Sequence, residues 1–126
     1  MIAGVGTDIV SIARIREAIQ RHEGRFARKV LSDDEWAIFT SRKDGAAFVA
    51  KRFAAKEAFY KAFGEPPGEA NTWHQLSILN DGAGRPRMEY GPLLAARIAE
   101  RGITGSHVSL SDEREYAVAC VILERI

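Results

Sequence analysis

The stretch AAFVAKRFAAKEAFYKAF, residues 46–63, decides the fold of this chain. Its alanines, lysines and glutamate favour a helix, and glycines stand just before and just after it, at Gly45 and Gly64. Charged side chains are spread around this helix among phenylalanines instead of lining one face. Because charges on an otherwise apolar helix need partners, we expect a buried helix whose charged groups are paired or in use.

One strand and further helices are expected before this central helix. Residues 2–10 are short and rich in β-branched side chains, as in a strand, and Ser11 is placed to cap a helix after it. A helix over residues 12–30 would be amphipathic, and Gly24 is the point where it could break in two. Ser32-Asp-Asp-Glu35 has the spacing of a capping box, so a short helix should follow.

After the central helix the pattern changes to alternation and turn residues. The expected elements are a hairpin with strands 73–79 and 85–90, a helix over 93–101, and a second hairpin with strands 107–111 and 115–123. The order strand, three helices, two strands, helix, two strands indicates an α+β fold with a mostly antiparallel sheet. We expect a single domain that spans residues 1–126.

The composition sets limits on the class of protein. With 126 residues, 46% of them hydrophobic and 28% charged, the chain resembles one compact soluble domain, and its net charge of +1 gives no general attraction to nucleic acid. The longest apolar stretch, residues 117–123, is far shorter than the ~20 residues that span a bilayer. The acidic Asp8 near the start is unlike a secretory signal. The single cysteine, Cys120, excludes a disulfide framework, and we expect it in the core of a cytoplasmic protein.

Two carboxylates, Asp8 and Glu57, stand in unusual places. Asp8 follows two glycines near the end of an apolar strand, where it either caps the next helix or binds a cation. Glu57 could form an ordinary i,i+4 ion pair with Lys61. Arg52 and Lys56 are either solvated surface groups or, with Lys61, cations suited to a polyphosphate. Since Mg²⁺ needs only one or two carboxylates beside substrate phosphates, a phosphoryl-transfer site is one interpretation.

A second candidate surface is basic. Residues 14–29 contain six basic and two acidic side chains. On a helix, four arginines lie opposite the apolar side, and we call them the arginine stripe: Arg14, Arg21, Arg25 and Arg28. This surface is either a solvated helix face or a docking site for an acidic partner.

Three motifs occur together in the chain: GVGTDIV at residues 4–10, KRFAAKEAFYKAFG at residues 51–64 and HVSLSDEREYA at residues 107–117. In combination they resemble the holo-acyl-carrier-protein synthases, a group of small phosphopantetheinyl transferases, and the resemblance runs nearly end to end. It implies transfer of the 4'-phosphopantetheine arm of coenzyme A to a serine of an apo acyl carrier protein, with release of adenosine 3',5'-bisphosphate, in support of fatty acid biosynthesis. It also implies the family fold and a homotrimer with sites at subunit interfaces.

The roles of individual residues follow from the same resemblance. Asp8 and Glu57 would bind Mg²⁺, and Lys61 would hold a phosphate oxygen during catalysis. Glu57, or a water beside it, is a candidate for taking the serine proton. Further contacts with coenzyme A would come from Arg52, at the nucleotide end, and from Gly64, Arg85, Pro86 and His107. The family has lysine where Arg85 stands, which keeps the charge but not its geometry, and His107 could instead be a half-buried structural histidine.

The resemblance also gives the arginine stripe a partner. Acyl carrier proteins are acidic, so these four arginines would steer and dock one. Two other functions stay open at this point. One is a non-catalytic adaptor that binds an acidic helical partner, with Asp8 as a simple cap. The other is a Mg²⁺-dependent hydrolase of nucleotide phosphates, in which water takes the place of the serine.

Overall fold

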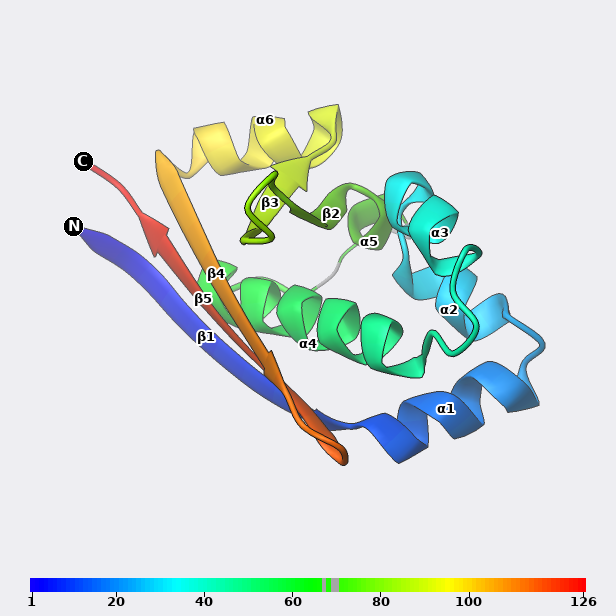
Figure 1. The fold of residues 1–126 in the computed structure, drawn as a ribbon. Helices are drawn as coiled ribbons and strands as arrows, with labels where there is room; N and C mark the ends of the chain where they lie inside the picture. Colours follow the sequence, from blue (N-terminus) through cyan, green and yellow to red (C-terminus); the bar gives the residue numbers. More distant parts are fainter. Residues whose placement is uncertain (67, 69–70) are drawn as a thin grey trace.

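The computed structural model describes residues 1–66, 68 and 71–126. A three-stranded antiparallel sheet has the strand order β1-β5-β4, and a separate antiparallel hairpin pairs β2 with β3 (Figure 1). The strands are β1 (Ile2–Ser11), β2 (Leu76–Asn80), β3 (Pro86–Tyr90), β4 (Gly105–Asp112) and β5 (Tyr116–Glu124). The helices are α1 (Ile12–Arg21), α2 (Arg25–Val30), α3 (Asp33–Phe39), α4 (Ala46–Phe63), α5 (Asn71–His74) and α6 (Pro92–Glu100). The expected α+β class and antiparallel pairing are confirmed.

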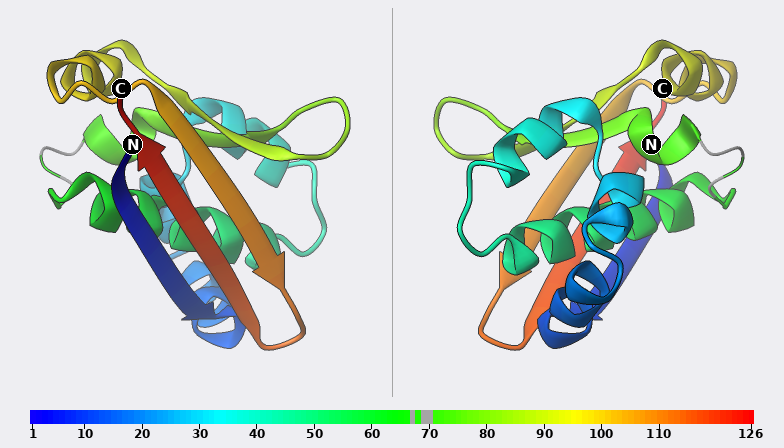
Figure 2. Two further views of the ribbon diagram at one scale, coloured as in Figure 1. Left: turned by 90° about the vertical axis from the view of Figure 1, so that its left-hand side faces the viewer. Right: turned by 90° about the vertical axis from the view of Figure 1, so that its right-hand side faces the viewer.

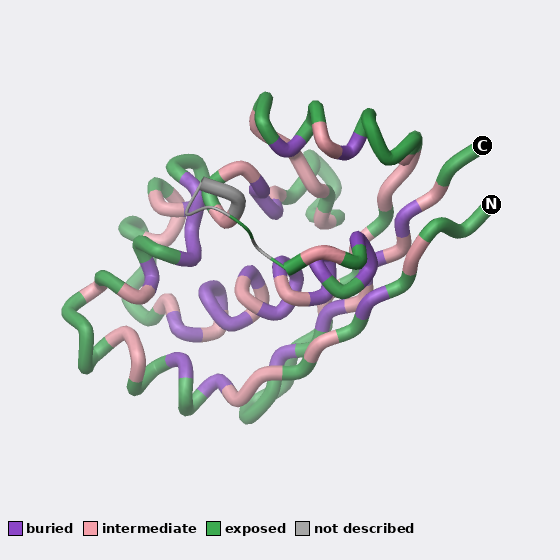
Figure 3. Tube along the Cα trace, turned by 180° about the vertical axis from the view of Figure 1, so that it is seen from behind, coloured by how far each residue is buried: buried purple, intermediate pink, exposed green. Residues whose placement is uncertain are grey.

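The central helix α4 crosses one face of the three-stranded sheet, and the other helices lie on that same side (Figure 2). Most of α4 is buried, as Figure 3 also shows, whereas α1 and α6 are buried along one side only.

Two glycines let β1 come close to α4. A Cβ on Gly6 would lie 1.9 Å from the carbonyl oxygen of Ala58, and one on Gly4 would lie 1.9 Å from that of Ala62. These glycines are therefore required by the close approach of strand to helix.

None of the described helices covers the opposite face of the three-stranded sheet (Figure 2). Val5 and Ile9 of β1 and Tyr116 and Val118 of β5 are exposed on it. Cys120 lies in the same alternating set of β5 and is only partly buried, so its expected place in the core is wrong. The reason is its position in the strand: Ala119 and Val121 face α4, and residues between them face outward.

Local signals in the sequence set most element boundaries. Ser11 caps α1 by accepting a hydrogen bond from the backbone N–H of Arg14, and Ser32 forms the expected capping box with Glu35. The long basic helix is broken at residues 22–24, where Gly24 has a φ of 86°. Among the described residues, no helix has the length and apolar character needed to cross a membrane.

The strand expected from Trp73 is wrong, because the chain forms the short helix α5 there and β2 begins at Leu76. The ring of Trp73 packs against Phe53 and Tyr60 of α4, with ring centroids 5.7 and 6.2 Å away. Its carbonyl oxygen accepts a hydrogen bond from Lys56. Tertiary contacts with α4 therefore outweigh the local alternation that favoured a strand.

Candidate active site

Strand β1 and helix α4 bring three of the candidate residues together. Asp8 is on the face of β1 that carries Gly4 and Gly6, and this face is turned toward α4. Lys61 Nζ donates hydrogen bonds to Asp8 Oδ1 at 3.1 Å and to the carbonyl oxygen of Thr7 at 2.9 Å. The side chain of Asp8 is 16% exposed and that of Lys61 is 55% exposed, so the cluster opens to solvent.

Glu57 lies one turn before Lys61 on α4 and shares this environment. Partial burial raises the pKa of Glu57 above its ordinary value, the negative charge of Asp8 raises the pKa further, and Lys61 lowers it. The two carboxylates are thus close enough to repel each other. A cation placed between them would relieve that repulsion.

The structure decides between the simpler alternatives for these residues. Ser11 is the N-cap of α1, so the interpretation of Asp8 as the cap is wrong. Lys61 forms its ion pair with Asp8 across the strand-helix contact, not the local pair with Glu57 that the spacing allowed. The ion pair with Asp8 is possible because the glycines of β1 let the strand approach α4 closely.

The donor set at this site fits a hard divalent cation. Magnesium is bound through oxygen atoms, commonly by one or two carboxylates together with waters and substrate phosphates. Asp8 and Glu57 provide two such carboxylates, from elements that are far apart in sequence. Within the described ranges, no group of three or more histidine, cysteine, aspartate or glutamate side chains could hold a metal ion.

Other candidate residues lie elsewhere in this chain. His107 is on the outer face of the sheet, where its Nε2 lies 2.5 Å from Glu124 Oε1, so the half-buried position considered for it is wrong. Arg85 ends the turn of the β2–β3 hairpin, and Pro86 begins β3. In the same turn, Asp81 accepts hydrogen bonds from the backbone N–H groups of Arg85 and Ala83, and these bonds lower its pKa. Gly64 caps the end of α4 with a φ of 82°.

The interpretation of Arg52 and Lys56 as solvated surface groups is wrong. Arg52 is 3% exposed, its Nε donates to the carbonyl oxygen of Ile78 at 3.2 Å, and its guanidinium lies 4.0 Å from the ring centre of Phe48. Lys56 is fully buried. Burial lowers the pKa of each, and the carboxylate of Glu35 opposes this effect in both cases.

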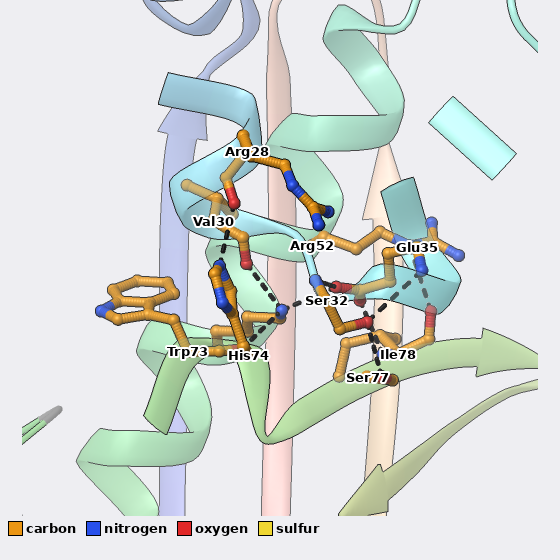
Figure 4. A network of polar contacts seen from close by, with 10 residues as sticks. Arg28, Val30, Ser32, Glu35, Arg52, Trp73, His74, Ser77 and Ile78 are labelled. Atoms are coloured by element: carbon orange, nitrogen blue, oxygen red, sulfur yellow. Dashed lines mark hydrogen bonds and ion pairs between the residues drawn. The ribbon is translucent and has the colours of Figure 1, made fainter. Parts of the chain in front are cut away.

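Lys56 belongs to a buried polar network that sequence reasoning missed. Figure 4 shows this network around Glu35, Val30 and Trp73. Its Nζ donates to Glu35 Oε1 at 2.6 Å, to the carbonyl oxygen of Val30 at 2.7 Å and to that of Trp73 at 3.0 Å. Glu35 Oε2 accepts from the backbone N–H of Ile78 at 2.7 Å. The capping-box spacing predicted that Glu35 caps α3, but no local sequence pattern predicts its pairing with a lysine 21 residues away.

The arginine stripe is divided between two helices. Arg14 and Arg21 are on α1, Arg25 and Arg28 are on α2, and all four are exposed. Arg28 forms an ion pair with Asp33 at 2.6 Å. A groove of about 610 Å³ beside Arg14 is lined by apolar and small polar side chains of β1, α1, α2, α4 and β5. The sequence therefore places the four charges correctly on the surface.

Comparisons with known proteins place these features in a family. Residues 4–121 match the sequence model of the 4'-phosphopantetheinyl transferase superfamily. The chain is 50% identical over 125 residues to a holo-[acyl-carrier-protein] synthase of Salmonella paratyphi C, with 98% of each chain covered. It is 38% identical to the crystal structure of the Neisseria meningitidis synthase, with a TM-score of 0.94, 99% of this chain and 100% of that chain covered. The Bacillus anthracis synthase, solved in complex with coenzyme A (3',5'-ADP), is 31% identical with a TM-score of 0.82, and 100% and 99% of the two chains are covered.

Proposed function

The chain belongs to the 4'-phosphopantetheinyl transferase superfamily, and we propose that it acts as a holo-acyl-carrier-protein synthase. It transfers the 4'-phosphopantetheine group of coenzyme A to a serine of an apo acyl carrier protein. The observation that carries this function is the similarity to named synthases over nearly the whole chain, with Asp8, Glu57 and Lys61 assembled at one site. Residues 1–126 form one transferase domain in this proposal.

The transfer is a displacement at phosphorus. The serine Oγ of the carrier forms a new P–O bond, and the P–O bond to adenosine 3',5'-bisphosphate breaks, with the electron pair leaving on that product. Glu57, or a water that it holds, accepts the serine proton; its raised pKa makes it a better proton acceptor than an ordinary carboxylate. Lys61 lies beside this site with an exposed ammonium that neutralises charge on a phosphate oxygen.

Asp8 and Glu57 would hold Mg²⁺ in this proposal. Held by these two carboxylates, such an ion would supply positive charge that polarises the phosphoryl group and offsets its negative charge. Lys61 is bonded to Asp8 and Thr7, so it fixes the position of Asp8 until substrate phosphates compete for its ammonium. Both carboxylates are held on rigid elements, which keeps the ligand geometry ready before substrate arrives.

The remaining contacts with coenzyme A are proposed to come from more than one subunit. Arg52, Gly64, Arg85, Pro86 and His107 do not gather around Asp8 within one chain. The bare apolar sheet face with Val5, Ile9, Tyr116 and Val118 offers a surface that a homotrimer would bury. His107 lies on that same face, so a neighbouring subunit could receive it in its site.

The arginine stripe is the proposed docking surface for the carrier. Its exposed charges suit an acidic protein and would speed the encounter at low salt. The enzyme is proposed to work in the cytoplasm, where it would supply fatty acid biosynthesis with holo carrier.

Mass spectrometry of a carrier tests this function. Purified protein, apo carrier, coenzyme A and Mg²⁺ should give a carrier heavier by one phosphopantetheine arm, and Asp8→Ala and Glu57→Ala should abolish this gain. An adaptor would bind the carrier without changing its mass. A hydrolase would consume coenzyme A with no carrier present. Either result would replace the proposed function.

A further inference from the structure

Lys56 is a fully buried cation, yet the proposed reaction does not use it. Each of its three N–H bonds has an acceptor: Glu35 Oε1, the carbonyl oxygen of Val30 and the carbonyl oxygen of Trp73. Glu35 is also fully buried, and backbone N–H groups of Ser32 and Ile78 satisfy the rest of its carboxylate. This pair is thus complete, as a buried ion pair must be to persist.

The pair sits where the ends of three helices meet. Val30 is the last residue of α2 and Trp73 is in the last turn of α5, so the ammonium lies at two carboxyl ends. Glu35 lies in the first turn of α3, so its carboxylate lies at an amino end. Each charge therefore has the sign that the adjoining helix end favours. Lys56 itself extends from α4, one residue before Glu57.

Helix α2 is short and depends on tertiary contacts: Ala27 and Val30 are buried in the core, and the ring of Phe26 packs against that of Phe53. It has six residues, follows a turn in which Gly24 is left-handed, and has no side-chain hydrogen bond at its N-cap. Helices this short are marginal without tertiary contacts. Besides the bond from Lys56 to Val30, the carbonyl oxygen of Arg28 lies 2.9 Å from Nε2 of His74; a carbonyl only accepts, so this nitrogen carries the hydrogen.

These two bonds bear directly on the arginine stripe. Half of the stripe, Arg25 and Arg28, is on α2, and Lys56 connects the carboxyl end of α2 to the helix that carries Glu57. A carrier docked on the stripe must present its serine at Glu57 within a fraction of an ångström of the reactive position. Productive docking of the carrier therefore depends on the distance between α2 and Glu57.

We propose that Lys56, together with His74, is a positioning residue for the carrier: it fixes α2 against α4 so that Arg25 and Arg28 hold the carrier in register with Glu57. This inference rests on the proposed function. It predicts that loss of the two bonds weakens the productive docking of the carrier and leaves the binding of coenzyme A and the chemical step nearly intact.

The main test uses a double variant, because Lys56→Met alone leaves the charge of Glu35 buried without a cation. Lys56→Met with Glu35→Leu replaces the ion pair by apolar side chains, an exchange that folded proteins often tolerate. The matched control is Lys51→Met, which makes the same change on the same helix and removes only a partly exposed ion pair with Asp112. Steady-state transfer is measured by carrier mass, with carrier and coenzyme A varied separately.

We expect the double variant to raise the KM for carrier about fivefold, the loss that two surface charge contacts represent. Its kcat and its KM for coenzyme A should stay within about twofold of the wild type, and the control should match the wild type. Arg25→Ala should also raise the carrier KM less in the double variant than in the wild type, because a displaced α2 no longer presents Arg25 to the carrier.

A carrier KM that stays at the wild-type value, or a KM for coenzyme A that rises by the same factor, overturns the inference. If the double variant does not fold, His74→Ala decides, since His74 is exposed and its loss removes the second bond to α2. A carrier KM raised about twofold by His74→Ala supports the positioning role, and an unchanged value refutes it. A wild-type protein without any transfer refutes the proposed function instead.

Discussion

The substitution Lys56→Met should destabilise the fold by about 3–5 kcal/mol, the usual effect of removing one partner from a buried ion pair. Lys56 Nζ lies 2.6 Å from Glu35 Oε1, and both side chains have no exposed area. After the change, Glu35 keeps its hydrogen bonds from Ser32 and Ile78 but has lost its cation, and two carbonyl groups lose a donor. Since a domain of this size has about 5–15 kcal/mol of stability, this is a large fraction of the total.

Urea unfolding at neutral pH, followed by tryptophan fluorescence, measures this loss. Lys51→Met should lower the free energy of unfolding by at most about 1 kcal/mol, because its ion pair with Asp112 spans 3.5 Å near solvent. Lys56→Met with Glu35→Leu should recover most of the loss seen in Lys56→Met. Equal losses in Lys56→Met and Lys51→Met would show that the buried ion pair stabilises the fold no more than the exposed one. A double variant no more stable than Lys56→Met would show that the unpaired charge of Glu35 is not the cause of the loss.

Three further predictions address the strand-helix contact, the acidic pair and the arginine stripe. Gly6→Ala should destabilise the protein by about 3 kcal/mol in urea unfolding, because its Cβ would lie 1.9 Å from a backbone oxygen of α4. Gly82→Ala is the control, because a Cβ there meets open space, and equal unfolding midpoints for the two variants would contradict the close packing of β1 on α4. Burial and Asp8 raise the pKa of Glu57, so the stability of the wild type without metal should fall as the pH rises from about 4.3 through that raised pKa. Glu57→Gln should remove this decline. An identical dependence of stability on pH in the wild type and in Glu57→Gln would show that the pKa is not raised. Arg21→Glu with Arg25→Glu should raise the carrier KM and flatten its dependence on salt, whereas unchanged carrier kinetics at low salt would exclude the stripe from the interface.

Local signals in the sequence predicted most of the fold. The composition of residues 46–63 predicted α4 to its boundaries, and the hydroxyl of Ser11 and the spacing of Ser32 and Glu35 predicted two helix starts. Each of these features depends on neighbours within a few residues. The short helix α5 was not predictable in the same way, because contacts of Trp73 with α4 determine it.

The candidate site was partly predictable for a similar reason. Asp8 stood out because a carboxylate is unusual near the end of an apolar strand. Only the structure shows that the two glycines before it let β1 approach α4 closely. The position of Asp8 beside Glu57 and Lys61 depends on the tertiary structure, and the motifs alone could only suggest it. The pairing of Lys56 with Glu35 was not predictable. The spread of charges around residues 46–63 indicated that Lys56 needs a partner, but Glu35 matched a local capping box and nothing in the spacing linked the two residues.

In the proposed function, Asp8 and Glu57 jointly hold the divalent ion that the transfer requires. The most direct measurement is the Mg²⁺ concentration that gives half-maximal transfer to the carrier, compared for wild type, Asp8→Asn and Glu57→Gln at saturating coenzyme A and carrier. Each variant should need at least about tenfold more Mg²⁺, or transfer nothing. A Mg²⁺ requirement that is unchanged in either variant would contradict it.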